Sequence, residues 1–246
     1  MKVRKEVVGG IIVIALIAGA IGVINTLQKE GQRAVLAKRV AQVSGGIPSS
    51  VEELRKAIAV YETRMDHYIK DAVQAGTYWK ILATRLQDQG LHQDALSALE
   101  RGIAYNPEDP TLQYLAGVSA AMVAKSYLDI DGNTGGSDRY YALAEAAYLN
   151  AIKMDGQYGK PLYALGILYV FELNRPADAI PPLLRYMELR KNDVDGLFVL
   201  ARAYVMNENY EEALDAYDQI IRTTNDKNRR SEAERNKQFV MDLYYG

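Results

Sequence analysis

The chain has 246 residues, a formal net charge of −2, 49% hydrophobic residues and 24% charged residues. These proportions are those of a globular protein, and without a basic surplus they argue against a nucleic-acid-binding surface. Cysteine is absent, which excludes disulfides, thiolate metal ligands and a lipid-modified cysteine. Tyrosine occurs 18 times and phenylalanine three times, so most aromatic side chains carry a hydroxyl that needs water or a hydrogen-bond partner.

After a short tail, residues 1–6, an uncharged apolar segment covers residues 7–27. Its length matches the roughly 20 residues that cross a bilayer, and it lacks the polar face of a helix in a globular protein. We therefore predict a transmembrane helix. The alternative is a cleavable signal peptide, because Ala18, Gly19 and Ala20 have the small-x-small form of a cleavage site. Apolar residues continue past that site to Ile24, which favours the anchor.

Positive charges stand on both sides of the apolar segment, so they nearly balance. A basic start before an apolar run is typical of an anchor whose N-terminus stays in the cytoplasm. We expect a single-pass protein of a bacterial cytoplasmic membrane with a periplasmic domain. Small residues on one face would let a second membrane helix approach and would permit self-association, although such residues are common in membrane helices. They are Ala15, Ala18, Gly19 and Gly22.

Residues 28–46 are predicted to be a helical connector that ends in a hinge, because Gly45, Gly46 and Pro48 interrupt the pattern. Ser50 and Glu53 have the spacing of a capping box that opens a new helix. Residues 47–75 are expected to form an N-terminal capping helix that packs on the domain through one apolar side. That side consists of Leu54, Ile58, Tyr61, Met65, Tyr68 and Ala72.

Beyond residue 75, helical stretches alternate with short turns, and small and large apolar residues recur in a fixed order. Gly166 and Ala201 are 35 residues apart, and Ala179 and Ala213 are 34 apart. The first occurrence consists of Trp79, Leu82, Ala83, Leu86, Ala95, Leu99, Gly102 and Pro107. This pattern resembles that of the tetratricopeptide repeat family, W-x2-L-G-x2-Y…A-x3-F…P.

The resemblance covers residues 76–225 as four repeats, and it implies an all-α, right-handed α-solenoid of helix pairs. One interval is too long, because Gly117 and Gly166 are 49 residues apart. We therefore predict an insertion within about residues 125–139, with a surface loop at 129–139. Residues 226–246 are expected to form a C-terminal capping helix that buries Phe239, Val240 and Leu243, since each repeat leaves an apolar face open.

No catalytic motif, phosphate loop or cofactor site is found, so we do not expect an enzyme. His67 and His92 have no second metal-like ligand nearby in the sequence. Asp129, Asp131 and Asn133 have the spacing of the first part of a calcium loop. Thr134 and Tyr140 occupy the positions where such a loop needs glycine and glutamate, so no metal is expected.

The family resemblance also implies a concave face formed by the first helix of each repeat. Family members that clamp a C-terminal carboxylate use a lysine–asparagine–arginine set, and Thr84 stands here at the asparagine position, so that function is not expected. An apolar groove lined by methionine and aromatic residues suits an amphipathic helix or an extended apolar segment. The residues expected to line it are Lys80, Tyr114, Val118, Met122, Tyr163, Ile167, Phe171, Phe198, Arg202 and Met206.

Two alternatives remain for this groove and for the function. The groove side chains either contact a partner, as we expect for Tyr163 and Phe198, or pack against the neighbouring capping helix. The anchored plan resembles that of scaffold proteins in bacterial envelope assemblies, including secretion, pilus and cytochrome-maturation machines and the periplasmic flagellar-motor collar of spirochaetes. The alternative function is a periplasmic chaperone or translocon-accessory factor that binds apolar segments of its clients.

Overall fold

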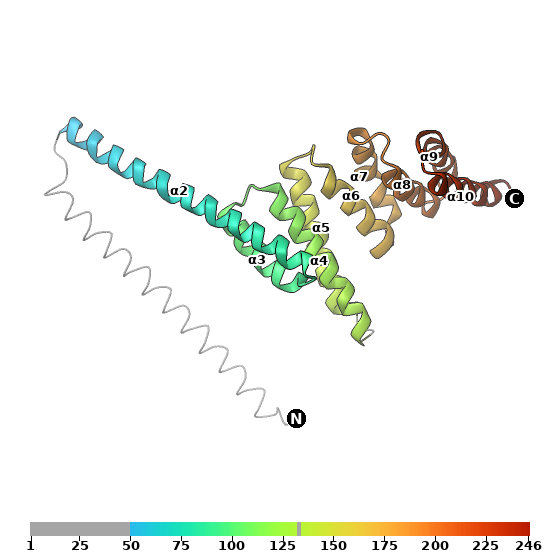
Figure 1. The fold of residues 1–246 in the computed structure, drawn as a ribbon, viewed down its shortest axis with the longest axis horizontal. Helices are drawn as coiled ribbons and strands as arrows, with labels where there is room; N and C mark the ends of the chain where they lie inside the picture. Colours follow the sequence, from blue (N-terminus) through green and yellow to red (C-terminus); the bar gives the residue numbers. More distant parts are fainter. Residues whose placement is uncertain (1–49, 132–133) are drawn as a thin grey trace, which may run out of the picture. The chain divides into compact units, whose positions relative to one another are not determined.

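The computed structural model describes residues 50–131 and 134–246, and within these residues it contains helices and turns but no strand. The chain divides into two compact units, residues 1–67 and 68–246. In the second unit, successive helix pairs follow one another along the chain (Figure 1). The elements are α2 (Val51–Asp88), α3 (His92–Tyr105), α4 (Pro110–Asp131), α5 (Thr134–Met154), α6 (Gly159–Ile167), η1 (Leu168–Glu172), α7 (Pro176–Leu189), α8 (Val194–Met206), α9 (Tyr210–Thr223) and α10 (Lys227–Tyr245).

The predicted start of helix α2 is confirmed by its capping box. The Glu53 amide donates to Ser50 Oγ at 3.1 Å, and the Ser50 amide donates to Glu53 Oε2 at 3.3 Å. These two contacts satisfy amides that lack intrahelical partners. The helix then runs without interruption through residue 75, so the expected capping helix and the first helix of repeat one are a single element.

The apolar side expected to pack on the first repeat is exposed over most of its length. Ile58, Met65 and Tyr68 are 53%, 60% and 71% exposed. Further along α2, Trp79 and Leu86 are partly buried against the core, and Ala83 is fully buried. The packing surface of α2 is therefore confined to its C-terminal part, where α3 supplies apolar partners.

Small residues at the predicted positions bring the paired helices together. Ala95 and Ala213 are fully buried. A Cβ atom on Gly117 would collide with the Tyr148 ring, and one on Gly166 would collide with Leu183. Absence of a side chain at these glycines therefore sets the close approach of α4 to α5 and of α6 to α7. This placement confirms the repeat register.

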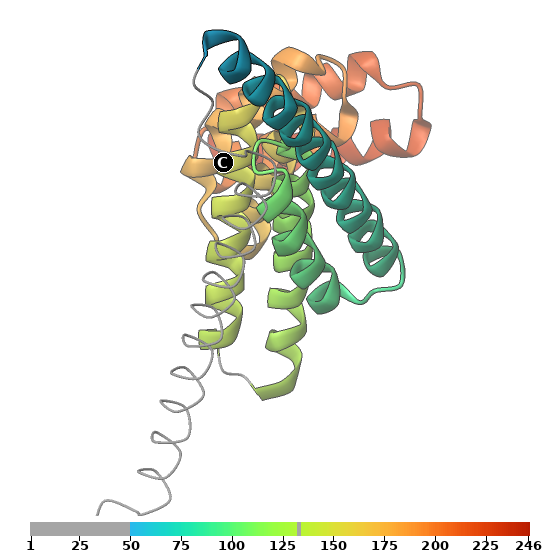
Figure 2. The ribbon, with the colours of Figure 1, turned by 90° about the vertical axis from the view of Figure 1, so that its left-hand side faces the viewer.

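The predicted insertion is present, but it is not a surface loop. Helices α4 and α5 have 22 and 21 residues, whereas α8 and α9 have 13 and 14. The extra residues lengthen both helices of the second repeat into a hairpin that runs beyond α6 (Figures 1 and 2). Tyr127 stacks on Tyr140 across the hairpin, with ring centroids 5.4 Å apart. Apolar contact between the two helices thus overrides the turn-forming composition of residues 129–139.

The interval from Gly166 to Ala201 is 35 residues, one more than the 34-residue interval from Ala179 to Ala213. The structure shows where the additional residue lies. Thirteen positions separate Gly166 from Ala179, whereas twelve separate Ala201 from Ala213. Between Gly166 and Ala179 lies η1, a five-residue π-helical segment in which the Leu173 amide donates to the Leu168 carbonyl at 3.0 Å. Bonding from residue i to i+5 accommodates one more residue per turn, and such segments are frequent at functional sites.

Across residues 50–131 and 134–246, no helix is both long enough and apolar enough to cross a bilayer. The predicted transmembrane helix at 7–27, with Ala15, Ala18, Gly19 and Gly22, lies outside the described residues, as do residues 28–46.

Candidate binding pocket

A pocket of about 540 Å³ lies at the C-terminal end of the repeat array. Four of the ten predicted groove residues line it, namely Phe171, Phe198, Arg202 and Met206, and they come from η1 and α8. Helix α10 supplies the opposite side. The complete lining is Phe171, Phe198, Val199, Arg202, Val205, Met206, Tyr217, Glu232, Asn236, Phe239 and Val240. We call this site the phenylalanine pocket.

The name reflects an uneven distribution of one residue type. The chain has three phenylalanines, and all three line this pocket although they are far apart in sequence. Phe171 is 49% exposed and Phe239 is 59% exposed. Exposed single apolar residues are ordinary, but a gathered set beside a cavity is typical of a binding site. The pocket thus combines an apolar lining with two rings that solvent can reach.

Phe171 belongs to the π-helical segment η1. One side chain contacts its ring, and two others hold the neighbouring residue Glu172. The Arg202 guanidinium lies over its ring, 5.0 Å from the centroid. The next residue, Glu172, accepts a hydrogen bond from Tyr141 Oη at 2.9 Å and pairs with Lys125 Nζ at 2.7 Å. Lys125 and Tyr141 belong to α4 and α5, so the base of the long hairpin fixes the segment that carries Phe171.

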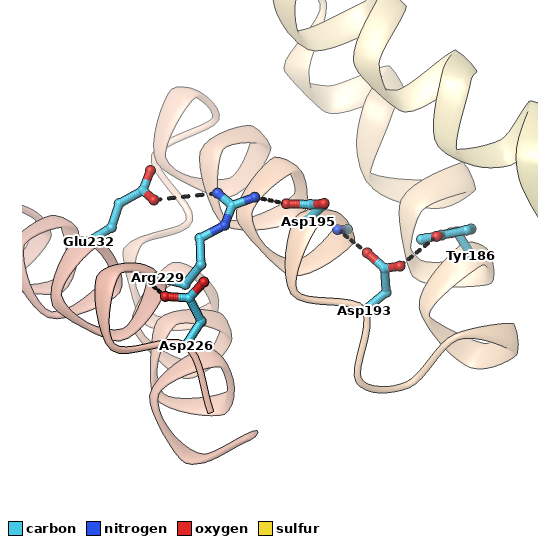
Figure 3. Close-up of polar contacts among 7 residues, drawn as sticks. Tyr186, Asp193, Asp195, Asp226, Arg229 and Glu232 are labelled. Atoms are coloured by element: carbon cyan, nitrogen blue, oxygen red, sulfur yellow. Dashed lines mark hydrogen bonds and ion pairs between the residues drawn. The ribbon is translucent and has the colours of Figure 1, made fainter. Parts of the chain in front are cut away.

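Phe198 lies deeper and is held by an ionic network between α8 and α10. The Arg229 guanidinium lies 5.2 Å from the centroid of its ring, a favourable cation–π geometry. Arg229 also pairs with Asp195 in α8 and, at 3.4 Å, with Glu232 in its own helix (Figure 3). The Tyr217 ring meets Phe198 edge-on at 6.3 Å. Phe198 therefore forms the fixed floor of the pocket and also packs between helices.

Helix α10 is fixed by charge and by burial, and this places Phe239. Asp226 caps the helix by accepting from the amides of Asn228 at 2.8 Å and Arg229 at 3.3 Å. Lys237 Nζ pairs with Asp218 of α9 at 2.7 Å. Val240 is buried, as predicted, but Phe239 and Leu243 are exposed, so the prediction that all three are buried is wrong. Phe239 and Val240 are adjacent in the helix, so their side chains point in different directions. Val240 is buried, and the exposed Phe239 ring lines the pocket.

Tyr163, which we expect to face a partner, is partly buried against the core. Its ring stacks on Tyr186 of α7 with centroids 5.1 Å apart. Burial, with Asp195 and Asp193 nearby, raises the pKa of the Tyr163 hydroxyl. Tyr186 donates to Asp193 at 3.1 Å, and Asp193 also caps α8 by accepting from the Gly196 amide at 2.7 Å (Figure 3).

Two other predicted groove residues, Lys80 and Tyr114, contact side chains within the repeat array. Lys80 Nζ pairs with Asp109 at 2.7 Å. Burial raises the pKa of Asp109, but hydrogen bonds from Lys80 and Thr111 outweigh it, and the pKa lies below its usual value. Tyr114 lies edge-on to Tyr158 with centroids 5.5 Å apart. Val118 and Ile167 are partly buried against the core.

Met122 lies apart from the phenylalanine pocket. It lines a second cavity of about 490 Å³ with residues of the α2–α3 turn, including His92. Buried Nδ1 of His92 has no hydrogen-bond partner among the described residues. These residues also contain no cluster of three or more histidine or acidic side chains able to hold a metal ion. Asp129 and Asp131 lie near the end of α4, and Asn133 lies outside the described residues.

Sequence reasoning missed the contribution of α10 to the site. Glu232, Asn236 and Phe239 line the pocket, but they follow the last repeat and so fall outside the family pattern. The scarcity of phenylalanine was the available signal. Because the chain has three phenylalanines and 18 tyrosines, the phenylalanine positions stand out in the sequence.

Comparison with known proteins agrees with this architecture. Residues 82–127 and 168–228 match the model of the tetratricopeptide repeat. Together with the helix pairs and their small-residue contacts, this match identifies these two stretches as repeats of the kind that defines the tetratricopeptide repeat family. Members of this family mediate protein–protein interactions and bind peptides. No curated protein sequence matches the chain significantly.

Several solved structures share the fold at low sequence identity. YrrB, a TPR protein with an unusual peptide-binding site, is 21% identical with a TM-score of 0.54, over 67% of this chain and 75% of YrrB. MamA 41-end from Desulfovibrio magneticus RS-1 is 16% identical with a TM-score of 0.51, over 69% and 94% of the two chains. A double mutant of MamA RS-1 has a TM-score of 0.57 at 15% identity, over 69% and 84%. Identities this low establish similarity of fold alone.

Proposed function

We propose that this protein is a membrane-anchored scaffold of a bacterial cell-envelope complex, and that it binds an apolar segment of a protein partner in the phenylalanine pocket. The observation that carries the proposal is the gathering of all three phenylalanines around one cavity. The uncharged run at residues 7–27 supports the anchor, because its length suits a bilayer. Attachment would confine the search for a partner to the plane of the membrane.

The chemistry of the pocket favours large apolar side chains with polar groups beside them. Its volume lies within the range of about 300–1,000 Å³ that is usual for ligand pockets. Phe171, Phe239 and Met206 offer apolar contact, and methionine adapts to ligands of different shape. Arg202 and Glu232 add one charge of each sign. An amphipathic helix that inserts apolar residues from successive turns suits this lining.

The test is to replace the two exposed rings, Phe171 and Phe239, by alanine in the full-length chain. Neither ring is buried, so the melting temperature should change little. Binding of the partner should weaken by about 2 kcal/mol or more, which is about thirtyfold in Kd, if the rings are hot spots. The partner is first identified with a photo-crosslinking residue at position 239 in cells, and its affinity is then measured by titration.

A matched control is Leu149→Ala, which removes a comparably exposed side chain of α5, outside the pocket. It should leave the affinity unchanged. One stoichiometric partner crosslinked at position 239 would support a scaffold, whereas a mixed set of clients would support the chaperone alternative. Unchanged affinity in both phenylalanine variants would contradict the proposed site.

Anchorage and orientation need a separate measurement. Protease added outside the cytoplasmic membrane should digest the repeat domain, because we place that domain in the periplasm. Removal of residues 1–27 should release the protein from the membrane fraction while leaving the helical circular dichroism signal. Protection from protease until the cells are lysed would reverse the orientation, and soluble full-length protein would contradict the anchor.

A further inference from the structure

Two sets of apolar residues in the first part of α2 each recur every seven positions, and Val60 lies outside both sets. Their spacing alternates between three and four positions, which is the period of a coiled-coil seam. The pattern continues at Tyr68 and Ala72 in the same helix. In heptad positions a and d, the residues up to His67 are Val51, Leu54, Ile58, Tyr61 and Met65.

These seam residues are exposed in the isolated chain. Val51 is 69% exposed, Ile58 is 53% exposed and Met65 is 60% exposed, while Leu54 and Tyr61 are 43% and 37% exposed. A row of large apolar side chains along one helix face is unfavourable in water. Further along α2, Trp79 and Leu86 continue the same spacing and pack against the core. The stripe is therefore a packing surface that is covered in one part and uncovered in the other.

We propose that the segment from Val51 to His67 pairs in parallel with the same segment of a second copy of this chain, forming a two-stranded coiled coil. The repeated a/d spacing is self-complementary, because each seam residue meets its equivalent in the other copy. Among parallel coiled coils, β-branched residues at a with leucine at d favour two strands. Val51 and Ile58 occupy a positions, and Leu54 occupies the intervening d position. This inference rests on α2 and does not depend on the proposed function.

Charges beside the seam are compatible with this pairing. In a parallel coiled coil, each g residue faces the e residue five positions later in the other copy. Ala57 then faces Glu62, and Arg64 faces Ile69, so no two like charges oppose each other. An antiparallel pair in which Val51 meets Tyr68 would place Arg55 beside Glu62 instead. An exposed ion pair of this kind contributes little, and we therefore favour the arrangement indicated by the a and d residues.

The chain lacks cysteine, so single cysteines give an unambiguous test in the full-length protein in mild detergent. Cysteine is introduced at one seam position at a time, in Val51→Cys, Ile58→Cys and Met65→Cys. Matched controls on the opposite helix face are Lys56→Cys and Thr63→Cys, both at f positions. Mild oxidation should convert most of each seam variant to a disulfide-linked dimer and little of each control.

A second set of variants tests whether the seam causes association. Ile58→Asp combined with Met65→Cys should lose the crosslink, whereas Thr63→Asp combined with Met65→Cys should keep it. Melting temperature should match that of wild type in both, because Ile58 and Thr63 are exposed. Equal crosslinking at seam and control positions, or none at the seam, would overturn the proposal. Crosslinking at 58 without crosslinking at 51 and 65 would indicate an antiparallel pair and would also overturn it.

Discussion

The first part of α2 and the C-terminal helix α10 differ in how many of their apolar side chains are buried. Between Val51 and His67, the described helix buries none of its large apolar side chains. Helix α10 buries Ala233 and Val240, and ion pairs join it to its neighbours, from Arg229 to Asp195 of α8 and from Lys237 to Asp218 of α9. Both helices leave apolar residues exposed, but in α10 one of them, Phe239, lines a cavity.

The difference shows that an apolar stripe on a helix beside a repeat array can have either of two roles. A stripe that meets a repeat completes the core, as Trp79 and Leu86 do within α2. A stripe that meets no repeat is available to another chain. Position relative to the array therefore decides the role of the stripe, and each helix should respond differently to the same substitution.

The largest contrast is expected for alanine-to-leucine substitution in the two helices. Ala233→Leu should lower the free energy of unfolding by about 1–3 kcal/mol, because Ala233 is fully buried and overpacking displaces its neighbours. Ala59→Leu should change it by less than about 0.5 kcal/mol, since Ala59 is exposed. Urea denaturation followed by circular dichroism measures both. Equal effects would show that the two helices are packed alike.

Ala213→Leu and Ala95→Leu extend the contrast into the helix pairs of the repeats. Both alanines are fully buried, so each substitution should also cost about 1–3 kcal/mol. The matched control is Ala104→Leu, on the exposed face of α3, which should be nearly neutral. Thermal melting ranks the three variants. A harmless Ala213→Leu would contradict the repeat register.

A smaller effect is expected when the ionic network of α10 is removed. Arg229→Met keeps most of the aliphatic length but loses the pairs with Asp195 and Glu232 and the contact with Phe198. The side chain of Arg229 is 39% exposed, so we expect a loss of about 1 kcal/mol. Raising the salt concentration should reduce this difference. A loss that does not depend on salt would point to packing as its cause.

Alkaline pH should weaken the packed array through Tyr186. Burial and the hydrogen bond to Asp193 raise its pKa to about 12, above the ordinary value of 10.0. The folded state therefore holds this proton more tightly than the unfolded state. Its contribution to stability is complete below pH 10 and is lost as the pH rises through 12. Tyr186→Phe should lose less stability than wild type over this interval, as measured by urea denaturation at each pH.

The smallest effect is expected for the hairpin of the second repeat. Replacing residues 129–139 by a short turn should change the free energy of unfolding by less than about 0.5 kcal/mol, because among the side chains described in this segment only Ser137 is buried. Contacts of Lys125 and Tyr141 with Glu172 lie outside the deleted segment and should persist. Differential scanning calorimetry provides the measurement. A large loss would mean that the hairpin tip supports the array.

Repeat spacing predicted most of the helix pairs, because close helix contacts demand small residues at fixed positions. Buried Ala95 and Ala213, and the tight approach at Gly117 and Gly166, follow directly from that requirement. The same reasoning located the extra residues but not their form. Composition at 129–139 favours turns, whereas helix hydrogen bonding and the stacking of Tyr127 on Tyr140 extend the two helices.

The candidate site was harder to predict because it joins elements from inside and outside the repeats. Phe171, Phe198, Arg202 and Met206 belong to predicted first helices, so their shared side could be read from the repeat register. Phe239 could not be placed in this way, since its orientation depends on how α10 lies on α9. For Tyr163, the repeat register alone does not give the orientation of the ring, because an aromatic residue on a first helix can also stack on its paired helix.

The gathering of every phenylalanine in one pocket has a practical consequence for spectroscopy. A chain grown with isotope-labelled phenylalanine would give aromatic signals from three side chains, and all three report on the same site. Trp79, the single tryptophan, lies in the first repeat and provides a reference fluorophore away from it. Ring-flip rates of Phe171, Phe198 and Phe239 would then record occupancy of the pocket without any engineered probe, and would separate the two exposed rings from Phe198.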